Sequence, residues 1–298
     1  MESVLMPIDS EKLLMHRGRM KFVENLAVYE KESGRTSLDV RRNNIFLMQN
    51  LELDPVIFVE LIAQSVACHS GYSKFISGAN PRHGYLVGVK DLVVTGKAIL
   101  GDHLDVLAEK GSEFDTLVYV KGTVLRNGNE TICSGIIKCW ETEMEIPING
   151  LSAKIDPGSR YAILESLFDS MSPSETDKSI VSRITSLSKD KKNATISADI
   201  YIDSGFIGFD GHFPKKPILP GVMMIKMGIT ALSLGFEKKI RLMEIKQSKF
   251  MKVIEPGHLI RIELSYSDAG GGVCDFQFQV FISEVLCAKI SATAGIIG

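Results

Sequence analysis

The predicted elements follow the same order twice along this chain of 298 residues. In each half, one or two short strands precede a single apolar helix, and several long strands follow it. The first helix is predicted over 54–78 and the second over 222–235. A chain of this length can hold two domains of ordinary size. The sequence therefore predicts a duplicated α+β unit, in which one buried helix packs against a run of antiparallel strands.

The first helix is apolar on nearly every side, which indicates burial. Asp54 and Pro55 suit its N-cap and first position, and Gly78 suits its end. The predicted strands of the first half are a hairpin at 25–42 and stretches at 85–94, 116–127 and 131–141. Those of the second half are 194–202, 240–254, 258–268, 274–283 and 288–297.

The stretch 142–160 carries two prolines and two glycines and has little periodicity, which is typical of a linker. We therefore expect an N-terminal domain over 1–145, a linker over 146–160 and a C-terminal domain over 161–298. Two such units in one chain would pair as the subunits of a homodimer do. Whether this pseudo-dimer forms a further homo-oligomer is left open.

Composition excludes several classes of function. The net charge of −2 gives no general attraction to nucleic acid or anionic membranes. The longest apolar runs fall short of the roughly 18–20 residues that span a bilayer, and the N-terminus does not resemble a signal peptide. The five cysteines have no CxxC spacing. This pattern favours a cytoplasmic protein with reduced thiols and no zinc site.

The sequence GFDGHFPKKPILPGV, at 208–222, places one histidine in a turn that three prolines stiffen. Gly221 opens the second helix, so its N–H is one of the unsatisfied donors there and favours an oxygen with partial negative charge. A fixed His212 beside such a donor is what proton abstraction next to a carbonyl requires. The alternative is a proline-rich turn whose histidine is bonded only for shape.

This turn resembles the motif of the hotdog-fold 3-hydroxyacyl-acyl-carrier-protein dehydratases of the FabZ and FabA type. The matching residues are Gly211, His212, Phe213, Pro214, Pro217, Pro220 and Gly221. The resemblance implies that His212 removes the α-proton of an acyl thioester and that the Gly221 N–H polarises the thioester carbonyl. In the family, a carboxylate fourteen residues after the histidine protonates the leaving hydroxyl. Lys226 stands there instead, and an ammonium is a poor substitute for a neutral acid.

The missing acid is found when the two helices are aligned. VELIAQ, in the first half, resembles the family's helix and places Glu60 opposite Lys226, with Gln64 on the same helix face. Phe46 occupies the histidine position of this half. Pro55 occupies the glycine position and has no N–H to offer. The first half therefore keeps the acid and lacks both the base and the oxyanion donor.

The losses in the two halves are complementary. In this family each site lies between two subunits and takes the histidine from one and the carboxylate from the other. The resemblance thus implies one complete composite site, formed by His212, Gly221 and Glu60, and a dead site that pairs Phe46 with Lys226. LLMHRGRMKFVENL, at 13–26, also resembles the opening of these enzymes. The division of residues is similar to that of the two-subunit dehydratase of aryl polyene biosynthesis.

Several neighbouring residues carry expectations of their own. Burial of Glu60 is expected to raise its pKa and favour the protonated acid. Gln64 either orients this acid or simply packs. We expect His16 to fix the N-terminal loop rather than to do chemistry. Further substrate contacts are expected from Gly211, Phe213, Pro220 and Val222.

The resulting hypothesis is a double-hotdog α+β lyase that converts 3-hydroxyacyl-acyl carrier protein to the trans-2-enoyl product, without cofactor or metal. The pathway would be fatty-acid-like or aryl polyene synthesis. Lysines and arginines within 237–252, with Lys215 and Lys216, form either a docking patch for acidic acyl carrier protein or a solvated strand face. Two alternatives remain: an acyl thioesterase of the same fold, and a non-catalytic scaffold that binds acyl groups or carrier protein.

Overall fold

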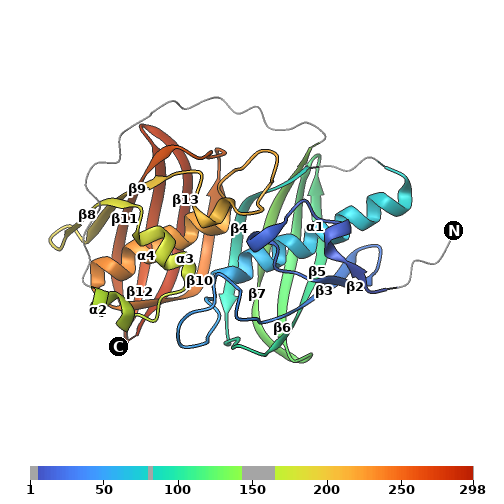
Figure 1. Cartoon of the computed structure of the whole chain (residues 1–298), viewed down its shortest axis with the longest axis horizontal. Helices are drawn as coiled ribbons and strands as arrows, with labels where there is room; N and C mark the ends of the chain where they lie inside the picture. Colours follow the sequence, from blue (N-terminus) through green and yellow to red (C-terminus); the bar gives the residue numbers. More distant parts are fainter. Residues whose placement is uncertain (1–5, 80–82, 143–164, 298) are drawn as a thin grey trace.

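The computed structural model describes residues 6–79, 83–142 and 165–297 (Figure 1). Within these ranges, thirteen strands form one antiparallel sheet, and two long helices lie against it. The strands of the first half are β1 Ile8–Asp9, β2 Asn25–Tyr29, β3 Ser33–Asp39, β4 His83–Val94, β5 His103–Phe114, β6 Leu117–Arg126 and β7 Glu130–Thr142. Those of the second half are β8 Ile184–Asp190, β9 Thr195–Ile202, β10 Lys239–Phe250, β11 His258–Gly270, β12 Val273–Ile282 and β13 Val285–Ile297.

The two halves have the same strand order, which confirms the predicted duplication. In space the first half runs β2-β3-β5-β6-β7-β4, and the second runs β8-β9-β11-β12-β13-β10. The long helices are α1 (Ile57–Ser77) in the first half and α4 (Gly221–Phe236) in the second. Figure 1 shows each helix lying across the strands of its own half. The chain is thus a pseudo-dimer of two similar units, as a double hotdog fold requires.

The strands of the two predicted units form one continuous sheet, because β4 pairs with β10 across the middle of the molecule. Gly88 lies on this seam, where a Cβ atom would approach the Ser248 carbonyl oxygen to 2.6 Å. The Val89 N–H also donates to the Ser248 hydroxyl at 2.9 Å. The absence of a side chain at Gly88 therefore lets the two halves join edge to edge.

Helix α1 begins later than predicted. The expected cap, Asp54, lies in a turn before the helix, where its Oδ1 accepts the N–H of Val56. The helix starts at Ile57, so Pro55 is not its first residue. Its end is as expected, because Gly78 adopts the left-handed conformation with φ of 69° and closes the last turn.

The elements that the sequence pattern failed to predict are mostly polar or short. Strand β5 is buried only near its start, and β8 is an exposed edge strand. The short helices α2 (Glu165–Ser170) and α3 (Glu175–Val181) were also missed. The predicted linker at 146–160 lies outside the described residues, and the domain bounds stay predictions. Within the described residues, no helix is both long and apolar enough to cross a membrane.

Candidate active site

The N-terminal loop of the first half is bound to the histidine turn of the second. The Arg17 N–H donates to the Gly211 carbonyl at 2.8 Å, and the Met20 N–H donates to the Asp210 carbonyl at 3.0 Å. Gly211 has φ of +90°, and a Cβ atom there would lie 1.6 Å from the Arg17 carbonyl oxygen. Only glycine combines this conformation with so close an approach of backbone. Gly211 therefore acts through the backbone, and it does not line the cavity described below.

His212 is buried, and one of its ring nitrogens is fixed by the turn that follows it. Nδ1 lies 2.8 Å from the Ile218 carbonyl oxygen, which can only accept a hydrogen bond. Nδ1 therefore carries the hydrogen, and the neutral ring keeps a basic Nε2. Burial, together with the nearby His16, lowers the pKa of His212 to about 4, although Glu60 opposes this shift. The ring is consequently neutral at pH 7 and able to accept a proton.

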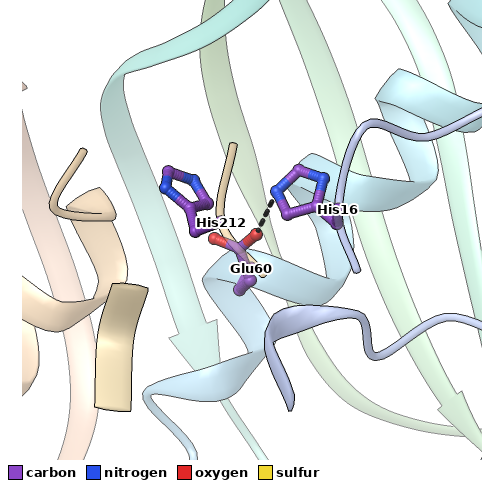
Figure 2. Close-up of side chains that lie close together, drawn as sticks. All are labelled: His16, Glu60 and His212. Carbon is purple, nitrogen blue, oxygen red and sulfur yellow. Dashed lines mark ion pairs between the residues drawn. The ribbon is translucent and has the colours of Figure 1, made fainter. Parts of the chain in front are cut away.

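Glu60 lies in the first turn of α1 and meets His212 from the other half of the chain (Figure 2). Ligand atoms of Glu60, His212 and His16 all lie within 4.8 Å of one another. The structure thus brings together the predicted base and the predicted acid, which lie about 150 residues apart in the sequence. Among the described residues, these three side chains are also the group whose spacing could hold a metal ion.

Gln64 contacts Glu60 one turn later on the same helix. Its Nε2 donates to Glu60 Oε1 at 2.9 Å and to the Met20 carbonyl at 2.7 Å. Its Oε1 accepts the Phe22 N–H at 2.9 Å. Both the amide nitrogen and the amide oxygen of Gln64 are therefore fixed by hydrogen bonds, and its Nε2 can hold the Glu60 carboxylate in place.

The expected rise in the pKa of Glu60 is wrong. Burial does raise this pKa, but the hydrogen bond and charge of His16, the charge of His212 and the hydrogen bond from Gln64 lower it by more. The net effect is a pKa below the ordinary value. In the resting site Glu60 is therefore an ionised carboxylate, and the proton of an acid catalyst must be held elsewhere.

Gly221 opens α4, and its N–H is one of the donors that a helix start leaves without an intrahelical partner. It lines the cavity, and a Cβ atom here would come within 2.9 Å of the Phe250 ring. The two neighbouring residues that were expected to contact substrate, Pro220 and Val222, lie outside the cavity wall. Pro220 caps the helix and Val222 is fully buried in the core, so neither lines the cavity. Of the expected further contacts only Phe213 does, where its ring stacks on Tyr85.

A cavity of about 570 Å³ opens beside the three titratable side chains, and both halves contribute to its wall. Along α1, the wall includes Glu60, Ala63, Ala67 and Gly71, which share one helix face. Met224, Phe250 and Met251 supply apolar surface from the second half. The space and its apolar lining suit an acyl chain.

Comparison with known proteins places these features in a family. The ApeP-like dehydratase family matches residues 8–147, and the ApeI-like dehydratase family matches residues 188–290. The 3-hydroxyacyl-[acyl-carrier-protein] dehydratase FabZ of Rhizorhabdus wittichii is 33% identical over 124 residues, which are 39% of this chain and 77% of that protein. The chain belongs to the 3-hydroxyacyl-acyl-carrier-protein dehydratase family. The predicted resemblance to a fused two-subunit dehydratase is confirmed.

Solved structures agree on the fold. The dehydratase domain of RzxB from Pseudomonas fluorescens has a TM-score of 0.54 at 12% identity and covers 94% of this chain and 98% of its own. A putative oleoyl thioesterase from Lactobacillus plantarum has a TM-score of 0.58 at 8% identity, with 90% and 96% covered. At such identities the likeness shows the fold alone, and it confirms the double hotdog architecture.

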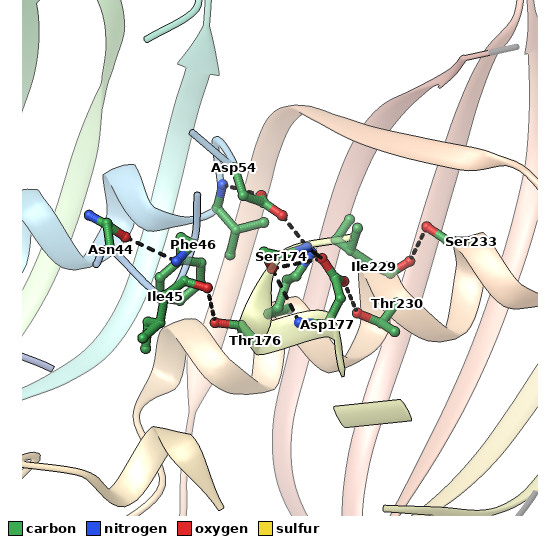
Figure 3. A network of polar contacts seen from close by, with 12 residues as sticks. Asn44, Ile45, Phe46, Asp54, Ser174, Thr176, Asp177, Ile229, Thr230 and Ser233 are labelled. Carbon is green, nitrogen blue, oxygen red and sulfur yellow. Dashed lines mark hydrogen bonds and ion pairs between the residues drawn. The ribbon is translucent and has the colours of Figure 1, made fainter. Parts of the chain in front are cut away.

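In this dehydratase family member, the second position of the pseudo-dimer is filled by an ion network (Figure 3). Lys226 Nζ lies 2.5 Å from Asp54 Oδ2 and 2.6 Å from Asp177 Oδ1. Thr230 donates to the same Asp177 carboxylate at 2.9 Å. Although burial alone would lower the pKa of Lys226, the charges of Asp177 and Asp54 raise it. Lys226 is thus a cation paired with two carboxylates, and Phe46, at the histidine position of the first half, is fully buried and has no titratable group.

His16 is the site residue that the sequence reasoning undervalued. It was expected only to fix the N-terminal loop, yet its Nε2 lies 3.3 Å from Glu60 Oε1 and its ring lies 5.1 Å from that of His212. The available signal was the resemblance of 13–26 to the opening of the family. That resemblance did not by itself indicate where the imidazole would lie.

Proposed function

We propose that this chain removes water from a 3-hydroxyacyl group carried by acyl carrier protein and gives the trans-2-enoyl product. The observation that carries the proposal is the meeting of His212 and Glu60, from different halves, at one apolar cavity. The related FabZ proteins carry the name of this activity. The pathway we propose is fatty-acid-like or aryl polyene synthesis, and the ApeP-like and ApeI-like matches of the two halves support a dehydratase made of two unlike units.

His212 is the base in this reaction. The bond from Nδ1 to the Ile218 carbonyl fixes the ring, and the lowered pKa keeps Nε2 free to take the C2 proton. Negative charge then develops on the thioester oxygen. The Gly221 N–H and the start of α4 stabilise that charge, as an oxyanion hole does.

Glu60 is the group that delivers a proton to the departing C3 hydroxyl. Gln64 and His16 hold its carboxylate at the cavity wall, opposite His212. The acyl chain extends along the Ala63, Ala67 and Gly71 face of α1. The reaction then breaks the C2–H and C3–O bonds, forms the C2=C3 bond and releases water.

The acyl carrier protein docks beside the cavity in this proposal, in the cytoplasm, where the five free cysteines stay reduced. The basic patch expected from the sequence is partly neutralised, because Arg241 pairs with Glu52 and Lys246 pairs with Asp275. Of the basic residues in this region, Lys252 lies on the cavity wall and the exposed Lys215 lies on the turn of His212, and in this proposal these two attract the acidic carrier.

Dehydration of a 3-hydroxyacyl carrier protein by the wild type, His212→Ala and Glu60→Gln tests the proposal. We expect kcat to fall by about a hundredfold or more in each variant, because each loses an acid–base group. The exposed His103→Gln is the matched control and is expected to keep the wild-type rate. A wild type that releases free acid without enoyl product is a thioesterase. Binding without turnover would make it a scaffold, and full activity of Glu60→Gln would refute the composite site.

A further inference from the structure

His16 reaches into the site from the N-terminal loop and contacts both catalytic side chains. Its side chain is 11% exposed and lines the cavity. Nε2 lies 3.3 Å from Glu60 Oε1, and the ring centroids of His16 and His212 are 5.1 Å apart. Its Nδ1 is buried, and no hydrogen-bond partner for it occurs among the described residues. The backbone bond from Arg17 to Gly211 holds this loop against the turn of His212.

Dehydration needs a proton that Glu60 does not itself hold. The leaving hydroxyl must be protonated, whereas the surroundings of Glu60 keep its carboxylate ionised. Glu60 contacts Gln64 and His16, and of these two side chains only the imidazole can give up a proton. His212 is neutral and serves as the base, so it cannot be the source.

We propose that His16 is the proton reservoir of the site, holding as an imidazolium the proton that Glu60 passes to the leaving hydroxyl. The inference rests on the proposed dehydration. His16 acts through Glu60 and is therefore a positioning residue that also stores a proton. The groups that face it are Glu60 from α1 and His212 from the turn, and the shared cavity wall also carries Lys74, Tyr85, Cys139, Glu141 and Lys252.

The proton transfers balance over one turnover. His212 Nε2 takes the C2 proton, and the C2–H electron pair becomes the C2=C3 bond. The C3–O pair leaves with the oxygen; His16 gives its proton to Glu60 at Oε1 and Glu60 passes a proton to that oxygen, so Glu60 ends the step ionised, as it began it. Water departs, His212 is now charged and His16 is neutral. With the rings 5.1 Å apart, one water molecule can return the proton from His212 to His16.

The first test is His16→Gln, which keeps a hydrogen-bond donor toward Glu60 but cannot store a proton. We expect kcat to fall by about a hundredfold, the usual contribution of an acid–base group, while KM changes less than threefold. We expect the alkaline limb of the wild-type pH–rate profile to be absent in the variant, which lacks the stored proton. Unchanged kcat with the wild-type pH profile would overturn the proposal. His103→Gln, an exposed histidine of the same half, is the control.

Chemical rescue separates proton storage from packing. His16→Ala leaves a gap beside the cavity, and added imidazole is expected to restore activity. A series of azoles of similar size should rescue in the order of their basicity if a proton is supplied. Equal rescue by all of them would show that the side chain only fills space, and would contradict the inference.

A measurement on the unaltered protein covers the case in which the variants do not fold. In ¹⁵N NMR spectra at neutral pH, His16 should show two protonated ring nitrogens and His212 one. A bare nitrogen on His16 would overturn the proposal. Failure of the underlying function looks different, because the wild type would then form no enoyl product at all.

Discussion

At the scale of single residues, the site depends on two buried groups: His212 has the charge state that burial favours, and Glu60 has the opposite one. Burial keeps His212 neutral, as a base requires. Glu60 is equally buried, yet its contacts with His16 and Gln64 keep it ionised. Hydrogen-bond donors around Glu60 stabilise its charged form. The neutral His212 ring, with its hydrogen on Nδ1, already satisfies its carbonyl partner, so this hydrogen bond does not require the ring to be charged.

The lowered pKa of His212 predicts a loss of stability in mild acid. The unfolded chain binds a proton at this residue near pH 6.5, whereas the folded chain does so only near pH 4. The free energy of unfolding therefore has its full contribution above pH 6.5 and loses it as pH falls toward 4, by up to about 3 kcal/mol. Urea unfolding of the wild type and His212→Gln at several pH values measures this. A variant with the same pH slope as the wild type would show that His212 does not cause it.

At the scale of elements, the docking of the N-terminal loop on the histidine turn decides whether His16 reaches the site. This contact consists of backbone N–H and carbonyl groups on both segments, so the side-chain pattern did not predict it. The glycine that permits it, Gly211, belongs to the family motif, but the expectation from that motif was a contact with substrate. The motif thus identified the residue, and only the three-dimensional packing showed its function.

Gly211→Ala is predicted to displace this loop. The new methyl group would meet the Arg17 carbonyl oxygen and would also strain a residue at φ of +90°. Gly257→Ala is a matched control, because Gly257 has φ of +91° and open space around its Cβ position. We expect the control to lose only the roughly 1 kcal/mol typical of such strain, while Gly211→Ala also loses at least tenfold in kcat. Equal losses in the two variants would show that the clash is unimportant.

The elements themselves were predictable to different degrees. The buried helices and the long alternating strands follow from apolar periodicity, and Gly78 marks the end of α1. The start of α1 was misplaced because Asp54, a typical cap, is used instead as a partner of Lys226. Strand β8 and the outer part of β5 are exposed and polar, so their strand conformation comes from pairing with neighbours. Such tertiary pairing leaves little trace in local sequence.

At the scale of the whole molecule, the two equivalent positions of the pseudo-dimer have different uses. One carries the candidate chemistry, and the other joins the halves through Lys226, Asp54 and Asp177. The complementary losses could be predicted from the sequence, because each half lacks the predicted catalytic residues that the other half keeps. The ion network was not, because Asp177 lies on α3, a short helix that the pattern did not predict.

Lys226→Met is predicted to destabilise the protein by about 3–5 kcal/mol, since two buried carboxylates lose their common cation. The triple variant Lys226→Met, Asp54→Asn, Asp177→Asn removes the unpaired charges and should recover much of this loss. Both proteins are expected to keep wild-type kcat when folded, because the network lies outside the candidate site. Thermal unfolding and dehydration rates provide the measurement. A folded Lys226→Met with no activity would show that the second position takes part in the reaction.

The pairing of β4 with β10 also bears on how the protein behaves on dilution. In a dehydratase built from separate subunits, the base and the acid separate whenever the subunits dissociate. Here the seam lies within one chain. The effective concentration of one half relative to the other is therefore constant, whatever the amount of protein in the cell. Turnover per chain should therefore stay constant at protein levels at which a two-subunit counterpart would come apart.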